Sequence, residues 1–318
     1  MLRYIKFFTA KCFSRISRCE ISLFHRFHKP PYGGSNQFFL AMRNELLRRD
    51  FSVGQNIIGS RTQMAVLNAF VFEEAAVKAM RHSKCCVVHR VDGPVSVYRR
   101  EADTSIDRLT AELNRKYADI TVFQSHYSLE AYEKMGLDFV SPVIIMNAVD
   151  SEIFYPSKRK FSQGSKIRLV ATSWSDNPNK GVETYKWLDR NLDWGRLEFT
   201  FIGRINCEFR NIKKVPPLPS LELADALREH DIYVTASIKD PCSNALIEGL
   251  GCGLPAICTN SGGHPEIVGE AGFCFDKKEE IPEMIDQLAG EYQIRQQKIH
   301  IPAITEVTDR YLAVGGIT

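Results

Sequence analysis

Apolar and polar residues alternate along this chain in blocks whose lengths separate strands from helices. In the first half, short apolar runs of strand length recur between longer stretches that have apolar residues at helical spacing. The predicted strands are 21–27, 64–70, 84–90, 119–125 and 142–147, and the predicted helices are 37–50, 71–82, 106–117 and 127–135. Strands that alternate with helices in this way predict an α/β fold with a doubly wound, parallel sheet.

A polar segment with proline and glycine, residues 150–166, interrupts the pattern and predicts a domain boundary. The alternation then restarts, with predicted strands at 166–173, 196–203, 231–237, 254–259 and 272–275 and predicted helices at 180–190, 221–229 and 243–250. We therefore expect an N-terminal extension at 1–20 and two Rossmann-like domains at 21–156 and 157–318. The C-terminal helix is expected to pack back on the first domain.

Composition narrows the class of protein. The chain has 318 residues, enough for two domains, and its 44% hydrophobic and 25% charged residues are typical of globular proteins. A net charge of +3 gives no indication of nucleic-acid binding, and no apolar run approaches the ~20 residues that span a bilayer. Nine cysteines without a C-x-x-C pair or metal-ligand spacing indicate reduced thiols, and hence a cytoplasmic protein.

The first twenty residues have a pattern of their own. Five Lys or Arg residues precede the first acidic residue, Glu20, and Ile5, Phe8, Cys12 and Ile16 recur at helical spacing. A basic amphipathic helix of this kind lies on anionic membrane surfaces, although transit peptides share the same bias. Two interpretations stay open: residues 1–19 make peripheral contact with the inner face of a membrane, or they are only an extension.

In an open parallel sheet, ligands bind where the strands end, so the loops at those ends are the candidates for chemistry. In the first domain, Gly33 and Gly34 open a predicted helix and allow a ligand to approach the backbone closely. His89 follows four apolar residues and is expected at a strand end, beside Asp92. A structural histidine is the alternative, but this position favours a functional one.

The second domain offers a more concentrated set. Lys180 stands at a predicted helix start, where an ammonium group can hold a phosphate. Ser243 or Asn244 can cap the helix predicted at 243–250 and leave its first backbone amides for a ligand. Asp240 precedes this cap, and Glu248 lies inside the helix. Both carboxylates are expected to face one cleft.

A glycine pair follows at the next loop of this domain. The amides of Gly262 and Gly263 are candidates to bind oxyanions. Together these loops predict a site for a ligand that carries both hydroxyl and phosphate groups.

The segment DPCSNALIEGLGCGLPAICTNSGGHPEIVG, residues 240–269, resembles the sugar-nucleotide signature of family 4 retaining glycosyltransferases. That signature consists of E-x7-E, a C/A-G-x-P turn and a Gly-Gly-x-Pro-Glu loop. Further likenesses, in the family's order, are PPYGGSNQFFLAMRNELLRRDFSV, HRVDG, ADITVFQS, IIMNAVDSEIFYP, NKG and ELADALREHDIYVTAS. The resemblance covers nearly all of 21–290 and implies a GT-B fold, in which two Rossmann-like domains face each other across a cleft.

The resemblance also implies roles for the candidates. The donor is expected to be a nucleoside-diphosphate sugar, with Asp240 on the sugar hydroxyls and Glu248 on the ribose. His89 is expected to contact the donor sugar. The expected donor-binding residues are Lys180, Ser173, Ser243, Asn244, Gly262, Gly263 and Gly203, and the expected acceptor-side residues are Gly33, Gly34 and Asp92.

The family works without a cofactor or bound metal, so neither is expected here. The expected acceptor is a glycan, a lipid-linked sugar or a polysaccharide.

Two departures from the family pattern leave alternatives open. The first acid of E-x7-E is an aspartate, Asp240, and the arginine that usually precedes the phosphate lysine is missing, with Ser173 and Ser175 in its region. A retaining glycosyltransferase is the leading interpretation. A sugar-nucleotide epimerase or hydrolase on the same fold, and a non-catalytic sugar-nucleotide-binding protein, are the alternatives.

Overall fold

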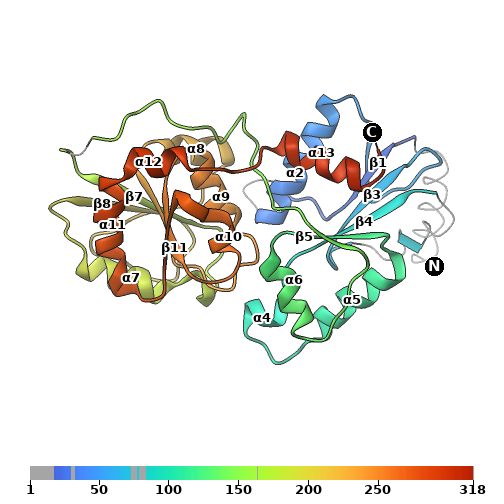
Figure 1. Cartoon of the computed structure of the whole chain (residues 1–318), viewed down its shortest axis with the longest axis horizontal. Coiled ribbons are helices and arrows are strands. Elements are labelled where there is room, and N and C mark those ends of the chain that lie inside the picture. Colours follow the sequence, from blue (N-terminus) through green and yellow to red (C-terminus); the bar gives the residue numbers. More distant parts are fainter. Residues whose placement is uncertain (1–17, 30–32, 73–76, 79–83, 163, 318) are drawn as a thin grey trace. The chain divides into compact units, whose positions relative to one another are not determined.

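A computed structural model describes residues 18–29, 33–72, 77–78, 84–162 and 164–317 (Figure 1). The chain forms two compact units. The first ends at His28, resumes from Ser35 to Met146 and includes the C-terminal segment from Ile304; the second consists of Lys29–Gly34 and Asn147–Ala303. The predicted N-terminal amphipathic helix, and most of the helix predicted at 71–82, lie outside the described residues.

The first unit contains a parallel sheet of six strands in the order β2-β1-β3-β4-β5-β6. Its strands are β1 (Ile21–Phe24), β2 (Val53–Gln55), β3 (Met64–Asn68), β4 (Cys86–Val91), β5 (Ile120–Phe123) and β6 (Pro142–Ile144). Its helices are α2 (Gly34–Arg48), α4 (Val95–Arg99), α5 (Ser105–Tyr117), α6 (His126–Glu133) and α13 (Ile304–Val314). Helices α2 and α13 lie on one side of the sheet and α4, α5 and α6 on the other (Figure 1).

Helix α13 returns to the first unit from the far end of the sequence. The ring of Tyr311 packs on Phe38 of α2, with 6.0 Å between ring centroids. Arg49, just beyond α2, pairs with Asp309 and donates to the carbonyl of Thr305 at 2.9 Å. Apolar and ionic contacts therefore join α13 to the helix that follows β1.

The second unit contains another six-stranded parallel sheet, in the order β12-β11-β10-β7-β8-β9. Its strands are β7 (Ile167–Ser173), β8 (Leu197–Gly203), β9 (Lys213–Val215), β10 (Ile232–Thr235), β11 (Ala256–Thr259) and β12 (Gly272–Phe275). Its α-helices are α7 (Val182–Asn191), α8 (Ser220–Arg228), α9 (Asn244–Gly251), α10 (His264–Val268), α11 (Ile281–Gly290) and α12 (Tyr292–Gln297). Its 3-10 turns are η2 (Pro178–Lys180), η3 (Gly269–Ala271) and η4 (Lys278–Glu280).

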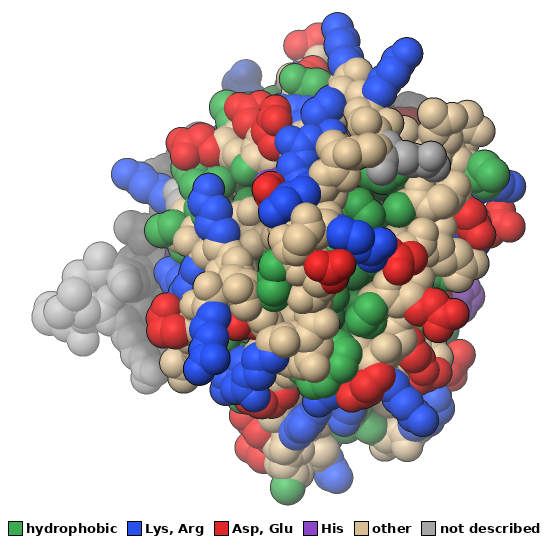
Figure 2. Space-filling model, turned by 90° about the vertical axis from the view of Figure 1, so that its left-hand side faces the viewer, with side chains coloured by type: hydrophobic (Ala, Val, Ile, Leu, Met, Phe, Trp, Pro, Cys, Tyr) green, Lys and Arg blue, Asp and Glu red, His purple; other side chains and the backbone are tan. Residues whose placement is uncertain are grey.

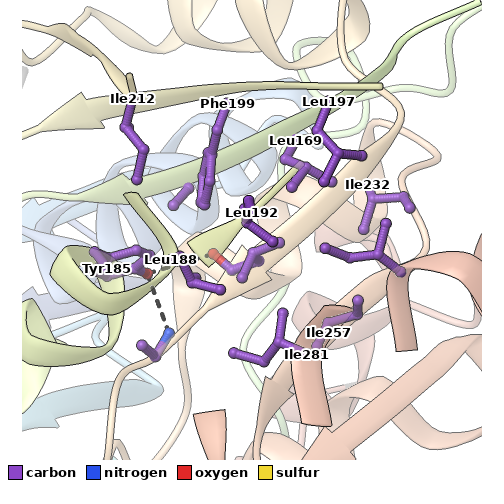
Figure 3. Packing of buried hydrophobic residues seen from close by; sticks show 14 of the residues in the cluster. Leu169, Tyr185, Leu188, Leu192, Leu197, Phe199, Ile212, Ile232, Ile257 and Ile281 are labelled. Atoms are coloured by element: carbon purple, nitrogen blue, oxygen red, sulfur yellow. Dashed lines mark hydrogen bonds between the residues drawn. The ribbon is translucent and has the colours of Figure 1, made fainter. Parts of the chain in front are cut away.

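One hydrophobic cluster holds α7 and α11 against this second sheet (Figure 3). Leu169, Phe199 and Ile257 project from three strands and meet Leu188 of α7 and Ile281 of α11, all at least 97% buried. Burying each such side chain contributes roughly 1.5–3 kcal/mol, so this cluster stabilises the packing of both helices on the sheet.

The predicted strands of both sheets are confirmed, with boundaries trimmed by a few residues. The strands β2 and β9 were missed, as were the helices α4, α10, α11 and α12. Both missed strands lie at a sheet edge, where only one neighbour contributes hydrogen bonds and no continuous apolar run is needed. Their sequences, Val-Gly-Gln and Lys-Lys-Val, therefore gave no signal.

On the face shown in Figure 2, Lys and Arg side chains are interspersed with Asp and Glu. This face of the molecule therefore presents no extended field of one sign, the feature that identifies nucleic-acid-binding surfaces.

Gly203 is required where β7 and β8 end side by side. It pairs in register with Ser173, has φ of +130°, and a Cβ there would lie 1.8 Å from the Ser173 carbonyl oxygen. We expect Gly203→Ala to lower the free energy of unfolding by about 2 kcal/mol or more, because both backbone strain and a clash are introduced. Urea denaturation measures the change.

The matched control is Gly290→Ala at the end of α11, where an added Cβ would meet nothing within 4 Å. That substitution should be neutral or slightly stabilising. Equal stability of the Gly203 variant and the wild type would contradict the assigned role.

Candidate functional site

Three neighbouring strands of the second sheet end at the candidate site. Strand β10 pairs in parallel with β7 on one side and β11 on the other. Their carboxyl ends therefore lie at one edge, and the loops 174–181, 236–243 and 260–263 follow from it. This edge is where open parallel sheets bind ligands.

Gly181 fixes the position of Lys180. It has φ of +80°, and a Cβ would lie 2.2 Å from the carbonyl oxygen of Ala236, just beyond β10. The carbonyl of Asn179 accepts a hydrogen bond from Ile238 N at 2.8 Å, and Tyr185 of α7 accepts one from Ala236 N at 3.1 Å (Figure 3). The turn before α7 is thus held against the loop after β10.

Lys180 consequently reaches Asp240, sixty residues away in the sequence. Its Nζ lies 2.9 Å from Asp240 Oδ2 and donates to Ser237 Oγ at 3.2 Å. Ser237 Oγ also approaches Asp240 Oδ2, at 3.5 Å. A cation, a hydroxyl and a carboxylate are therefore joined at the end of β10, with the side chains of Lys180 and Asp240 still 20% and 12% exposed.

Asp240 is ionised in this setting. Burial alone would raise its pKa, but the charge of Lys180 and the hydrogen bonds from Lys180 and the Cys242 amide lower the pKa below the ordinary value. The ion pair therefore keeps a charged carboxylate inside a largely buried loop.

The glycine pair after β11 supports Asp240. A Cβ on Gly262, which has φ of +69°, would lie 2.3 Å from the Asp240 carbonyl oxygen. The amide of Gly263 donates to that same oxygen at 2.9 Å. The expectation that both amides are available to an oxyanion is therefore corrected: Gly263 N is already bonded, and the pair positions the backbone of Asp240.

His264 is a site residue that the sequence analysis missed. It is fully buried, and its Nδ1 lies 2.9 Å from Thr259 Oγ1. Because the Thr259 hydroxyl donates its proton to the Ser237 carbonyl, its oxygen accepts from His264 Nδ1–H. Thr259 thus ties His264 to the loop of Asp240. The only signal was its place in GGHPE, a loop considered for its backbone amides alone.

Helix α9 begins at the expected place. Ser243 is its N-cap and accepts a hydrogen bond from Leu246 N at 3.4 Å. Asn244 follows as the first helical residue, and its Oδ1 accepts from Asn147 Nδ2 at 3.0 Å. The Ser243 oxygen accepts the capping hydrogen bond, which leaves its O–H free to donate to a ligand.

Glu248 lies one turn into α9, partly buried, with no side-chain hydrogen bond within the described part of the chain. Burial raises its pKa to about 8. Asp240 and Glu248 therefore differ: no contact between them is found among the described residues, and one carboxyl is ionised at neutral pH while the other is mostly protonated.

Ser173 and Gly203 form the adjoining strand ends. Ser173 Oγ donates to the carbonyl of Ser175 at 2.6 Å, and the Ser173 carbonyl accepts from Arg204 N at 2.8 Å. Gly203 is required by its close approach to Ser173. Both residues, expected to bind the donor, shape the loops that border the site.

His89 is not where the sequence analysis expected it. It lies inside β4, not at its end, and is fully buried. Nε2 is 2.8 Å from the Ala69 carbonyl, so it donates there, and Nδ1 lies 3.0 Å from Asn114 Nδ2. Burial lowers the pKa of His89 to about 4, and both ring nitrogens are occupied. The expected contact of His89 with a donor sugar is therefore corrected to a structural role.

Asp92 is the first residue after β4, and its side chain is partly exposed. Its carboxylate accepts from Arg90 Nη1 at 3.1 Å, from Gln124 Nε2, and from Ser35 Oγ at 3.4 Å, while 37% of its side chain is exposed. Arg90, which the sequence analysis missed, is fully buried with its guanidinium 4.8 Å above the ring of Phe38. A buried arginine thus holds an accessible carboxylate in a fixed orientation.

Gly33 and Gly34 group with the second unit. A Cβ on Gly34 would lie 2.2 Å from Asn244 Nδ2, so a side chain there would displace Asn244. Glycine at 34 is therefore explained by close packing within this unit.

Neither a metal-binding cluster nor a membrane-spanning helix is found among the described residues. They contain no group of three or more His, Cys, Asp or Glu that could hold a metal ion. Nor does any helix among them have the length and apolar character needed to cross a membrane.

A family model described as Glycosyl transferases group 1 matches residues 188–291. The matched range is about a third of the chain, and it contains Asp240, Glu248 and the Gly262–Gly263 loop. A search of curated proteins by sequence finds no match.

Solved structures match nearly the whole chain. Sucrose-phosphate synthase from Thermosynechococcus elongatus is 12% identical with a TM-score of 0.66, over 93% of this chain and 94% of that one. Anabaena Alr3699/HepE in complex with UDP and glucose is 14% identical with a TM-score of 0.68, over 93% and 99%. At these identities the likeness establishes the fold. The chain has the α/β fold of GT-B glycosyltransferases, with two parallel six-stranded sheets.

The raised pKa of Glu248 predicts a pH-dependent stability. Its folded-state pKa of about 8 exceeds the ordinary 4.5, so its contribution is fully present below pH ~4.5 and is lost as pH rises through about 8. Glu248→Gln should remove that loss, and its stability relative to wild type should rise by about 1 kcal/mol or more between pH 5 and 9. Urea denaturation across this range measures it.

The control is Glu183→Gln on α7, whose exposed carboxyl has a lowered pKa because Lys186 donates to it. Its effect should be flat between pH 5 and 9. Parallel pH profiles for wild type and the Glu248 variant would show that this carboxyl titrates normally.

Proposed function

We propose that this protein is a glycosyltransferase that moves a sugar from a nucleoside-diphosphate sugar to a glycan, lipid-linked or polysaccharide hydroxyl. The observation that carries the proposal is the Lys180–Asp240 pair, whose Nζ and Oδ2 atoms are 2.9 Å apart. The pair lies at the neighbouring carboxyl ends of β7, β10 and β11. Asp240 also falls within the segment that matches the glycosyltransferase family.

Lys180 would act on the leaving group. Transfer breaks the bond between the anomeric carbon of the sugar and a diphosphate oxygen, and negative charge grows on that oxygen. A cation already fixed at this place stabilises the charge without reorganisation. The arriving diphosphate offers Lys180 a second anionic partner beside Asp240.

The two carboxyl groups would bind different parts of the donor, Asp240 the transferred sugar and Glu248 the ribose. As the glycosidic bond lengthens, the anomeric carbon gains oxocarbenium-like positive charge, and the ionised Asp240 can accept hydrogen bonds from nearby sugar hydroxyls. Glu248 would hold the ribose hydroxyls. Because a carboxylate accepts from both hydroxyls of a diol, nucleoside affinity is expected to rise with pH through about 8.

The proposed stereochemistry rests on the resemblance of residues 240–269 to the signature of retaining enzymes. We propose attack on the face from which the diphosphate departs, so that the configuration is retained and the leaving phosphate takes the acceptor proton. The reaction is proposed to need no metal. On the acceptor side, Asp92 offers an oriented, accessible carboxylate to a sugar hydroxyl.

Variants of the ion pair test the assignment. Lys180→Ala should weaken nucleoside-diphosphate binding about tenfold or more and nucleoside binding little, because only the phosphate contact is lost. Asp240→Asn should slow transfer about 100-fold while diphosphate still binds. Calorimetry with a panel of nucleoside diphosphates, then a transfer assay with the matching donor sugar, measures both.

Lys186→Ala is the control, since Lys186 pairs with Glu183 on the surface of α7. Equal losses for nucleoside and diphosphate, or unchanged turnover in Asp240→Asn, would remove these residues from the site. Donor cleavage without an acceptor would identify a hydrolase, and binding without turnover a non-catalytic protein. The anomeric proton coupling of the product, by NMR, tests retention.

Peripheral membrane contact through residues 1–19 is part of the proposal and rests on their five cations. Each Lys or Arg near an anionic surface contributes about 1 kcal/mol, so binding should be weak and sensitive to salt. A chain that starts at Cys19 should stay folded and bind donor but no longer sediment with anionic liposomes at low salt. Equal sedimentation of the full-length and shortened chains would show that residues 1–19 are only an extension, and it would favour a soluble acceptor.

A further inference from the structure

The loop between β7 and α7 lies between two cations of different kinds. Lys180, at its end, already has the carboxylate of Asp240 at 2.9 Å. At its start, the Arg204 guanidinium lies over the ring of Trp174, with Cζ 4.5 Å from the ring centroid. Trp174 and Arg204 directly follow the paired strand ends Ser173 and Gly203.

The backbone fixes where the Arg204 side chain begins. Arg204 N donates to the Ser173 carbonyl at 2.8 Å, and Gly203 is so close to that carbonyl that no Cβ fits there. Trp174 is partly buried, and its ring supports one face of the guanidinium. An arginine stacked in this way keeps its N–H edge for an anion, since stacking uses only its face.

The loop between these two cations is itself braced. Ser173 Oγ donates to the carbonyl of Ser175, Asn177 N donates to Ser175 Oγ at 3.1 Å, and Asn179 N donates to Asn177 Oδ1 at 2.9 Å. The loop that carries Trp174 and Lys180 is therefore held by its own hydrogen bonds, and Arg204, at the neighbouring end of β8, stacks on the ring at the start of this loop.

Among the described residues, no carboxylate forms an ion pair with Arg204. Arg204 is exposed, whereas Lys180 has a carboxylate partner. The segment SWSDNPNKG carries no arginine of its own before Lys180.

We propose that Arg204, supported by Trp174, is the second cation of the anion subsite and binds the diphosphate together with Lys180. This inference rests on the proposed function, because it names a further residue of the same donor site. Arg204 follows β8, the strand that pairs with β7, and so lies outside the loop that holds Lys180. The site would therefore need no arginine within that loop.

The test compares Arg204→Ala with wild type by calorimetry. The probes are inorganic pyrophosphate, the nucleoside diphosphate that wild type binds most tightly among UDP, GDP and ADP, and the corresponding nucleoside. Arg204→Ala should weaken pyrophosphate and diphosphate binding about tenfold and nucleoside binding less than about twofold. The loss should shrink at high salt, because Arg204 is exposed. Arg204→Lys, which keeps the charge but not the planar fork, should lose less.

Arg210→Ala is the matched control, an exposed arginine in the segment between β8 and β9. Unchanged diphosphate affinity in Arg204→Ala, or an equal loss in Arg210→Ala, would overturn the proposal. Equal weakening of nucleoside and diphosphate would overturn it too, since it would place Arg204 on the base. Wild type that binds no diphosphate would instead overturn the proposed function, and this assignment with it.

Discussion

The ion pair of Lys180 and Asp240 is the constraint around which the second unit builds its site. It can form only because Gly181 lets the turn before α7 press against Ala236, and because Gly262 lets the loop after β11 press against the backbone of Asp240. Either contact excludes a Cβ. Two glycines with positive φ thus convert three strand ends into one polar cluster, and the lowered pKa of Asp240 is the electrostatic consequence.

Central strands were predictable because strands buried on both faces read as apolar runs, as 64–68 and 256–259 do. The edge strands β2 and β9 need no such run and were missed. In the site, the general rule that ligands bind at strand ends singled out Lys180 and Asp240, and the structure brings them together. Their ion pair was not predicted, because residues so far apart in sequence meet only through glycine contacts.

The errors share one cause. His89 and Gly263 were chosen for polar atoms, but whether such an atom is free depends on partners that the local sequence does not reveal. The nitrogens of His89 are occupied by Ala69 and Asn114, and the amide of Gly263 is occupied by Asp240. Arg90 and His264 were missed for the converse reason: an arginine and a histidine inside apolar or glycine-rich segments gain their roles from Asp92 and Thr259.

Asp240 and Glu248 stand eight positions apart, yet their surroundings move their pKa values in opposite directions. A cation lowers one, and burial raises the other to about 8. Pairs of this kind mark sites where two carboxyl groups serve different tasks. A ligand that draws Lys180 toward its phosphates raises the pKa of Asp240, and hydroxyls that donate to Glu248 lower the pKa of that group. The proposed donor has both features, so its binding would bring the two pKa values closer and would be coupled to protonation of both carboxyl groups.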